Sequence, residues 1–131
     1  MKSLIDFTPN FTKKELECPC CGAYQIKDKA LWNLQAFRNR LCNMFHRDIR
    51  LIVNSGYRCE KHNKEVGGVP NSQHLVGNAI DIYSPDIHVG ILYNEAINSG
   101  LFTTIILYEK SHFIHVDVRK RDRIKYWRWE K

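Results

Sequence analysis

A single long amphipathic helix constrains the fold of this chain most strongly. From Asp28 to His46 the apolar residues recur at helical spacing, which predicts a helix that packs one face against a hydrophobic core. The apolar members of the pattern are Leu31, Leu34, Phe37, Leu41, Met44 and Phe45. A chain of 131 residues has room for one core of this size, so we expect a single domain over residues 1–131.

The rest of the chain predicts short strands and shorter helices. Clusters of β-branched and aromatic residues predict strands at residues 49–53, 79–83, 103–107 and 113–118. Pro85 and Gly100 bracket a second helix, and residues 60–66 favour a third, shorter one. Thr12 and Glu15 form a capping-box pattern that opens a helical turn. The expected fold class is α+β, a small single domain in which helices pack on a mostly antiparallel sheet.

Composition and charge exclude several classes of protein. Hydrophobic residues make up 44% and charged residues 26%, which is typical of a globular chain and excludes disorder and fibrous repeats. No apolar run approaches the roughly 20 residues of a membrane span, so we expect no stable membrane insertion. The net charge of +6 favours an anionic partner, whether nucleic acid, membrane surface or bacterial wall polymer. Residues 1–7 lack the apolar core of a secretory signal, and we expect synthesis in the cytoplasm.

Three possible metal ligands lie in or beside the predicted strands. Asp81 alternates with isoleucines in the 79–83 strand, where a carboxylate is costly to bury unless it is paired or binds a metal. His115 lies in the 113–118 strand, and His74 lies seven residues before Asp81. Antiparallel pairing of the two strands would bring Asp81 and His115 together, with His74 approaching from the loop. Two imidazoles and one carboxylate with an open fourth position form a catalytic zinc ligand set.

The motifs around these residues resemble those of a known family. They are Ser55-Gly56-Tyr57-Arg58-Cys59, His62-Asn63 with Val66-Gly67-Gly68, Ser72-x-His74-x-x-Gly77-x-Ala79-x-Asp81 and His115-Val116-Asp117. In this order they resemble the zinc D-Ala-D-Ala carboxypeptidase family, peptidase M15, which includes phage endolysins. The resemblance extends from about Phe11 to Trp127, nearly the whole chain. It implies a hedgehog/DD-peptidase-like fold and one catalytic Zn²⁺ ion held by His74, Asp81 and His115.

The resemblance also implies roles for residues around the metal. Arg58 corresponds to an active-site arginine that binds substrate and steadies its charge, which suits a guanidinium near zinc. His112 stands three residues before the last ligand, at the position of the family's general base. Because residues three apart on a strand face opposite sides, His112 needs a turn or bulge at the start of that strand. Ser72 either binds substrate or caps its loop, and Asp117 either orients His115 or forms a salt bridge.

The implied activity is hydrolysis of a peptide bond in the peptidoglycan stem peptide by zinc-activated water. The enzyme would be a D-Ala-D-Ala carboxypeptidase or an endolysin-type endopeptidase, and which bond it cuts stays open. We expect a monomer that has no nucleic-acid partner and degrades the bacterial cell wall after release through a separate pore. The alternatives are a catalytically inactive wall-binding protein of the same fold, and a zinc-stabilised nucleic-acid-binding module that uses the basic, aromatic tail. A plainer interpretation of the tail is that Trp127 and Trp129 pack on the domain.

The sequence leaves open whether the five cysteines are free, paired in disulfides or bound to metal. Cys42 lies in the apolar pattern of the long helix and is expected to be a core residue. The other four lie in two places along the chain, at Cys18, Cys20 and Cys21 and at Cys59. They could form a disulfide from Cys20 or Cys21 to Cys59. They could instead hold a structural zinc ion, with Cys18, Cys21, Cys59 and His62 as its ligands, or remain free thiols. Either the disulfide or the zinc ion would hold the segment next to Arg58 in place.

Overall fold

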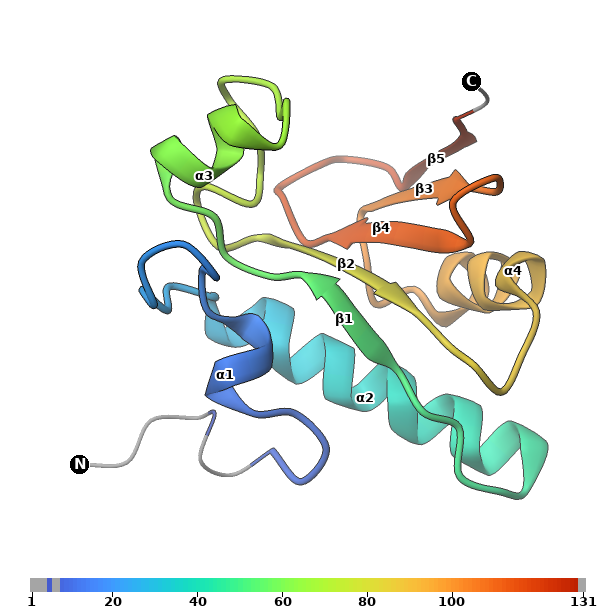
Figure 1. Ribbon diagram of the computed structural model, residues 1–131. Helices are drawn as coiled ribbons and strands as arrows, with labels where there is room; N and C mark the ends of the chain where they lie inside the picture. The colour runs from blue at the N-terminus through green and yellow to red at the C-terminus, as the bar shows by residue number, and fades with distance from the viewer. Residues whose placement is uncertain (1–4, 6–7, 130–131) are drawn as a thin grey trace.

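The computed structural model describes Ile5 and residues 8–129, and it contains a five-stranded sheet (Figure 1). In spatial order the strands are β1 (Ile52–Ser55), β2 (Ala79–Tyr83), β4 (Phe113–Asp117), β3 (Thr104–Tyr108) and β5 (Lys125–Arg128). The helices are α1 (Lys13–Leu16), α2 (Asp28–Phe45), α3 (Glu60–Glu65) and α4 (Val89–Ser99). Neighbouring strands are antiparallel except β3 and β5, which are parallel. The predicted α+β class, with helices packed on a mostly antiparallel sheet, is confirmed.

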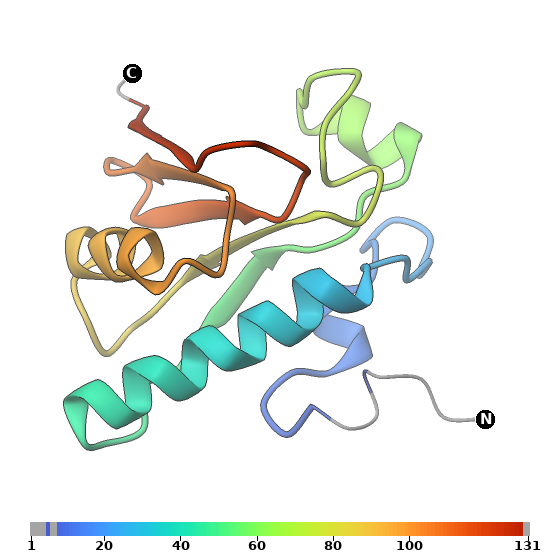
Figure 2. The ribbon, with the colours of Figure 1, turned by 180° about the vertical axis from the view of Figure 1, so that it is seen from behind.

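The alternation of side chains along the strands gives the sheet two different faces. On one face, buried aliphatic side chains from β2, β3 and β4 form the core. The helices α2 and α4 lie on this side of the sheet (Figure 2). Phe37 of α2 meets Phe102 edge to face in this core, with ring centroids 5.6 Å apart. The opposite face of the sheet, here called the polar face, carries Asp81, Thr104, His115 and Asp117. Because neighbouring residues of a strand point to opposite sides, a well-packed core and a row of buried polar groups come from the same three strands.

The long helix that the sequence predicts is present as α2. Its residues Leu31, Leu34 and Phe37 are fully buried, as the helical spacing requires. The helix ends at Phe45, and His46 adopts the left-handed conformation that often terminates a helix. Met44, which the apolar pattern includes, is exposed in the last turn. The pattern therefore identified the buried face correctly over all but the last turn.

Two predicted elements differ from the structure by more than one residue at a boundary. The first strand lies at Ile52–Ser55 and not at residues 49–53, although Ile49 and Leu51 are buried as predicted. The second long helix begins at Val89, with His88 as its N-cap, and not directly at Pro85. The physical reason is that Asp86 accepts three hydrogen bonds from Arg50, which hold the segment before α4 as a turn. The helix ends as predicted at Gly100, whose φ is 69°.

The C-terminal segment forms the edge strand β5. It packs on the domain through pairing with β3, while Trp127 and Trp129 remain 38% and 46% exposed. The prediction that these two side chains pack on the domain is thus only partly right: the ring of Trp129 lies 6.4 Å from that of Tyr108, but both tryptophans keep much of their surface exposed. Among the described residues, no helix is long and apolar enough to cross a lipid bilayer.

A candidate metal centre on the polar face

Three buried side chains converge on the polar face of the sheet. Asp81 of β2 and His115 of β4 are direct partners in the antiparallel register, and His74 reaches them from the loop before β2. The Oδ1 atom of Asp81 lies 3.2 Å from Nε2 of His74 and 3.0 Å from Nδ1 of His115. One donor atom from each residue lies within 4.8 Å of the other two. The structure therefore brings together the three residues that strand alternation and loop position predicted as metal ligands.

The two imidazole rings are held by the nitrogens that face away from this centre. Nδ1 of His74 lies 2.8 Å from the carbonyl oxygen of Gly56, so this nitrogen carries the proton that it donates. Nε2 of His115 lies 2.8 Å from Oδ2 of Asp117, a side chain that is itself fully buried. When the outer nitrogen of a neutral imidazole donates a proton, the inner nitrogen has a free lone pair, which is how metal-ligating histidines are usually oriented. Asp117 therefore has both of its predicted roles. It orients His115, and it forms a salt bridge with Arg119.

The electrostatics of the centre favour a bound cation. Burial raises the pKa of Asp81, but the nearby His74 and His115 outweigh it and hold the pKa below its ordinary value. Burial lowers the pKa of His115, but hydrogen bonds to Asp117 and Asp81 outweigh it and raise the pKa to about 9. The two carboxylates therefore hold a positive charge on a ring that burial alone would keep neutral. A metal cation would supply that charge in the same place, so the donor set fits a divalent metal.

Arg58 lies at the edge of the same centre. Its Nη2 atom is 3.4 Å from Oδ2 of Asp81, the carboxylate oxygen that does not face the histidines. Its Nε atom donates to the hydroxyl of Ser55, and its Nη1 atom donates to the side-chain oxygen of Asn63. Three partners leave two of the five guanidinium N–H groups for other acceptors. The roles of Ser55 and Asn63 as acceptors for Arg58 were not predicted from the sequence, although both residues lie in the quoted motifs.

The loop before β2 is shaped to hold His74. The hydroxyl of Ser72 accepts the backbone N–H of His74, which is the loop-capping role that the sequence left open. The role of Ser72 in substrate binding stays a prediction. Gly77 has a φ of 78°, and its carbonyl oxygen accepts the N–H of Lys27 at 2.9 Å. Any side chain at this position would collide with the backbone of Gln25, so the motif requires glycine here.

His112 lies outside the cluster of three ligands. The turn that it needs is present: its backbone N–H donates to the carbonyl of Glu109, and its φ of 57° is left-handed. The side chain is exposed, and no hydrogen bond or ion pair joins its ring to another residue in the described part of the chain. The turn before β4 is therefore confirmed, and the role of His112 as general base stays a prediction.

Tyr108 is a neighbour of the centre that sequence analysis missed. It stacks on Phe113, with ring centroids 4.6 Å apart, and these two residues are partners in the β3–β4 register. Burial raises the pKa of Tyr108, and the charge of Asp81 raises it further, so the phenol stays neutral. Tyr108 lies two residues after Ile106, which pairs with His115. This spacing places Tyr108 on the polar face, and it is the sequence feature that could have identified it.

Comparison with known proteins agrees with this geometry. A family model described as Peptidase M15 matches residues 8–117. Over 76 residues, which are 58% of the chain, the sequence is 36% identical to the zinc D-Ala-D-Ala carboxypeptidase of Streptomyces albus G. The matched segment covers 28% of the length of that relative.

Proposed function

Because the chain belongs to the peptidase M15 family, we propose that it is a zinc-dependent peptidase that hydrolyses a peptide bond in the peptidoglycan stem peptide. The observation that carries this proposal is the convergence of His74, Asp81 and His115 with the outer nitrogen of each ring already bonded. The name of the relative, a zinc D-Ala-D-Ala carboxypeptidase, supports both the metal and the class of substrate.

The three ligands leave a further coordination position for water or substrate, as catalytic zinc sites do. A bound zinc ion supplies an acidified water and polarises the scissile carbonyl group. Asp117 and the carbonyl of Gly56 keep the two rings in the tautomers that ligate. These outer contacts explain why the site needs residues from three separate segments of the chain.

Arg58 and His112 act on the substrate in this proposal. Arg58 is only 15% exposed, and Ser55 and Asn63 fix its guanidinium beside Asp81. Its remaining N–H groups bind either a terminal carboxylate or the oxyanion that forms during hydrolysis. His112 takes a proton from the attacking water and returns it to the leaving amine, and its exposed position on the turn allows it to exchange protons with solvent.

The net charge of +6 suits a substrate in an anionic cell wall. We propose that the protein acts there as a monomer, either as a carboxypeptidase that removes a terminal D-alanine or as an endolysin-type endopeptidase. If Arg58 binds the free carboxylate at the end of the stem peptide, a carboxypeptidase is favoured. If Arg58 binds the oxyanion, its role fits a carboxypeptidase and an endopeptidase equally. Release through a separate pore stays a prediction.

Digestion of purified peptidoglycan, followed by mass spectrometry of the stem peptides, tests the proposal. A carboxypeptidase shortens pentapeptides by one alanine, whereas an endopeptidase produces two fragments from each stem. The matched control is His115→Ala, which removes one ligand and should abolish cleavage. Intact stem peptides after incubation with the zinc-loaded protein would favour the inactive wall-binding alternative. If the protein instead shifted nucleic acids in a salt-sensitive manner without cleaving peptidoglycan, the nucleic-acid-binding alternative would be correct.

A further inference from the structure

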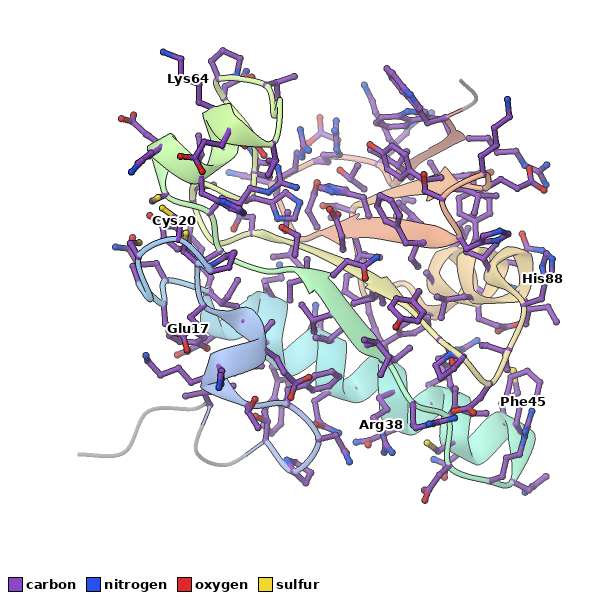
Figure 3. The ribbon with its side chains drawn as sticks, in the orientation of Figure 1. Glu17, Cys20, Arg38, Phe45, Lys64 and His88 are labelled. Atoms are coloured by element: carbon purple, nitrogen blue, oxygen red, sulfur yellow. The ribbon has the colours of Figure 1, made fainter. Side chains whose placement is uncertain are left out.

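A second group of possible metal ligands lies away from the catalytic centre. Cys18 and Cys20 belong to the loop that follows α1, and Cys59 is the N-cap of α3. Figure 3 labels Cys20, and yellow sulfur atoms lie together beside it, between this loop and the start of α3. All five cysteines of the chain are free thiols in the structure.

The thiols are close together without being bonded. Sγ of Cys59 lies 3.6 Å from that of Cys18 and 3.8 Å from that of Cys20, and all three sulfurs lie within 4.8 Å of one another. The side chain of Cys21 also interacts with those of Cys18 and Cys59, but its sulfur lies outside the group of three. A disulfide would use only two of these four thiols. An ion between the three converging sulfurs would use all three, and Cys21 of the same loop would complete a set of four.

The distances match those of a tetrahedral zinc site. Zinc binds thiolate sulfur at about 2.3 Å, and the edge of a tetrahedron is about 1.63 times its centre-to-corner distance, which gives about 3.8 Å between sulfurs. The two separations of 3.6 and 3.8 Å agree with this value. The loop and the start of α3 thus place three of the four sulfurs near the geometry of the bound state.

Backbone hydrogen bonds hold the loop and the sulfur of Cys18 in place. Its sulfur accepts the backbone N–H of Cys59 at 3.5 Å and interacts with the backbone N–H groups of Cys20 and Cys21. The N–H of Gly22 closes the loop onto the carbonyl of Cys18 at 2.8 Å, with a left-handed φ of 73° that suits glycine. The hydrogen bond from Cys59 to the sulfur of Cys18 thus joins the loop after α1 to the start of α3.

We propose that Cys18, Cys20, Cys21 and Cys59 hold a second, structural zinc ion as four thiolates. Each thiol loses its proton to solvent as it ligates. Sequence spacing suggested His62 as a ligand, but only the backbone N–H of His62 contacts the cluster, where it donates to Sγ of Cys59 at 3.4 Å. In the structure Cys20, and not His62, lies beside the sulfurs of Cys18 and Cys59.

This ion would link two segments that support the catalytic centre. Cys59 directly follows Arg58, and the N–H of Tyr57 donates to the carbonyl of Leu16 at 2.9 Å, two residues before Cys18. A four-coordinate zinc has no open position for a substrate, so its role is to hold Arg58 in place. The cluster shares no residue with the catalytic centre, so the two metal sites can be tested separately.

The test is the zinc content of the full chain, purified under reducing conditions and measured by mass spectrometry of the metal. We expect two zinc ions per chain in the wild type and one in the His74→Ala/His115→Ala double variant, which lacks catalytic ligands. Cys59→Ser should bind one, and so should Cys20→Ser, whose side chain is exposed and contributes nothing to the hydrophobic core. Cys42→Ser, outside the cluster, should keep two and serves as the matched control.

Cobalt substitution in the His74→Ala/His115→Ala variant gives an independent signal. Cobalt on thiolates produces charge-transfer absorption in the near ultraviolet, which should be strong in this variant and weak after Cys20→Ser is added. A double-histidine variant that binds no zinc, or thiol counting in denaturant that finds two thiols missing until reductant is added, would overturn the proposal. Neither result would affect the proposed peptidase activity, which depends on the other site.

Discussion

Replacement of Asp117 by asparagine tests whether the metal centre depends on a residue that does not touch the metal. Asp117 is fully buried, and its Oδ2 atom lies 2.8 Å from Nε2 of His115. Asparagine keeps the shape of the side chain and an acceptor oxygen, but it loses the negative charge. The other nitrogen of His115 therefore becomes a weaker ligand while the packing of the sheet is preserved.

The size of the effect follows from this one hydrogen bond. Hydrogen bonds to charged groups contribute about 1.5–3 kcal/mol, and each factor of ten in an equilibrium constant corresponds to about 1.4 kcal/mol. Loss of the bond should therefore weaken zinc binding by about 10- to 100-fold, the range typical of outer contacts to metal ligands. Asp117→Asn should fall near the lower limit and Asp117→Ala near the upper limit, because alanine also removes the acceptor.

The assay is stem-peptide hydrolysis at a series of free zinc concentrations set by a chelator. Because the cysteine cluster is the same in the wild type and in both variants, a difference between them in this readout reports the catalytic ion. The concentration at half-maximal activity should rise in both variants, while activity at saturating zinc largely recovers. Circular dichroism of the metal-free proteins checks that the fold is intact.

Arg119→Gln is the matched control for this prediction. Arg119 binds the same carboxylate with its Nη2 atom at 2.7 Å, but it does not contact His115. The control removes the salt bridge and leaves the bond between Asp117 and His115, so zinc dependence should stay near that of the wild type. An unchanged zinc dependence in Asp117→Asn, or an equal shift in Arg119→Gln, would refute the reasoning.

Three further predictions address the loop, the pH dependence and the base. Gly67→Ala should lower the free energy of unfolding in a urea titration by about 1–2 kcal/mol, the cost of a left-handed residue with open space around it. Gly77→Ala should lower it clearly more, because its side chain would meet the backbone of Gln25; equal losses would contradict the steric argument. Hydrogen bonds from Arg50 lower the pKa of Asp86 from 3.8 to about 2, so their stabilising effect is present above pH 3.8 and is lost as the pH falls through about 2. Asp86→Asn should therefore flatten the acid limb of a plot of stability against pH, and an unchanged limb would argue against this contact. His112→Ala should retain its zinc but lose about 10²–10⁴ in hydrolysis rate, and unchanged turnover would exclude His112 as the base.

The long helix and the three ligands could be predicted because each depends on a local period. Helical spacing identified the buried face of α2, and the period of two along β2 placed Asp81 opposite the core isoleucines. The same alternation excludes a shift of one residue between β2 and β4, because that shift would move the isoleucines out of the core, and the structure pairs Asp81 with His115. For these features the information lies within a few neighbouring residues.

The contacts that complete the site could not be predicted because they join distant segments. Arg58 meets the carboxylate of Asp81 across 23 residues. The ring of His74 is held by the carbonyl of Gly56, eighteen residues earlier, and a backbone oxygen leaves no trace in the sequence. The start of α4 was predicted too early for a similar reason, since the contact between Asp86 and Arg50 spans 36 residues.

Anomalous X-ray diffraction at the zinc edge, from crystals of the zinc-loaded protein, tests the central claim most directly. We expect a peak at about 2.0–2.1 Å from Nε2 of His74, from Nδ1 of His115 and from a carboxylate oxygen of Asp81. The rings of both histidines should keep their bonds to Gly56 and Asp117. Fully occupied zinc elsewhere in the crystal, with no peak among these three residues, would contradict the assignment of the catalytic centre.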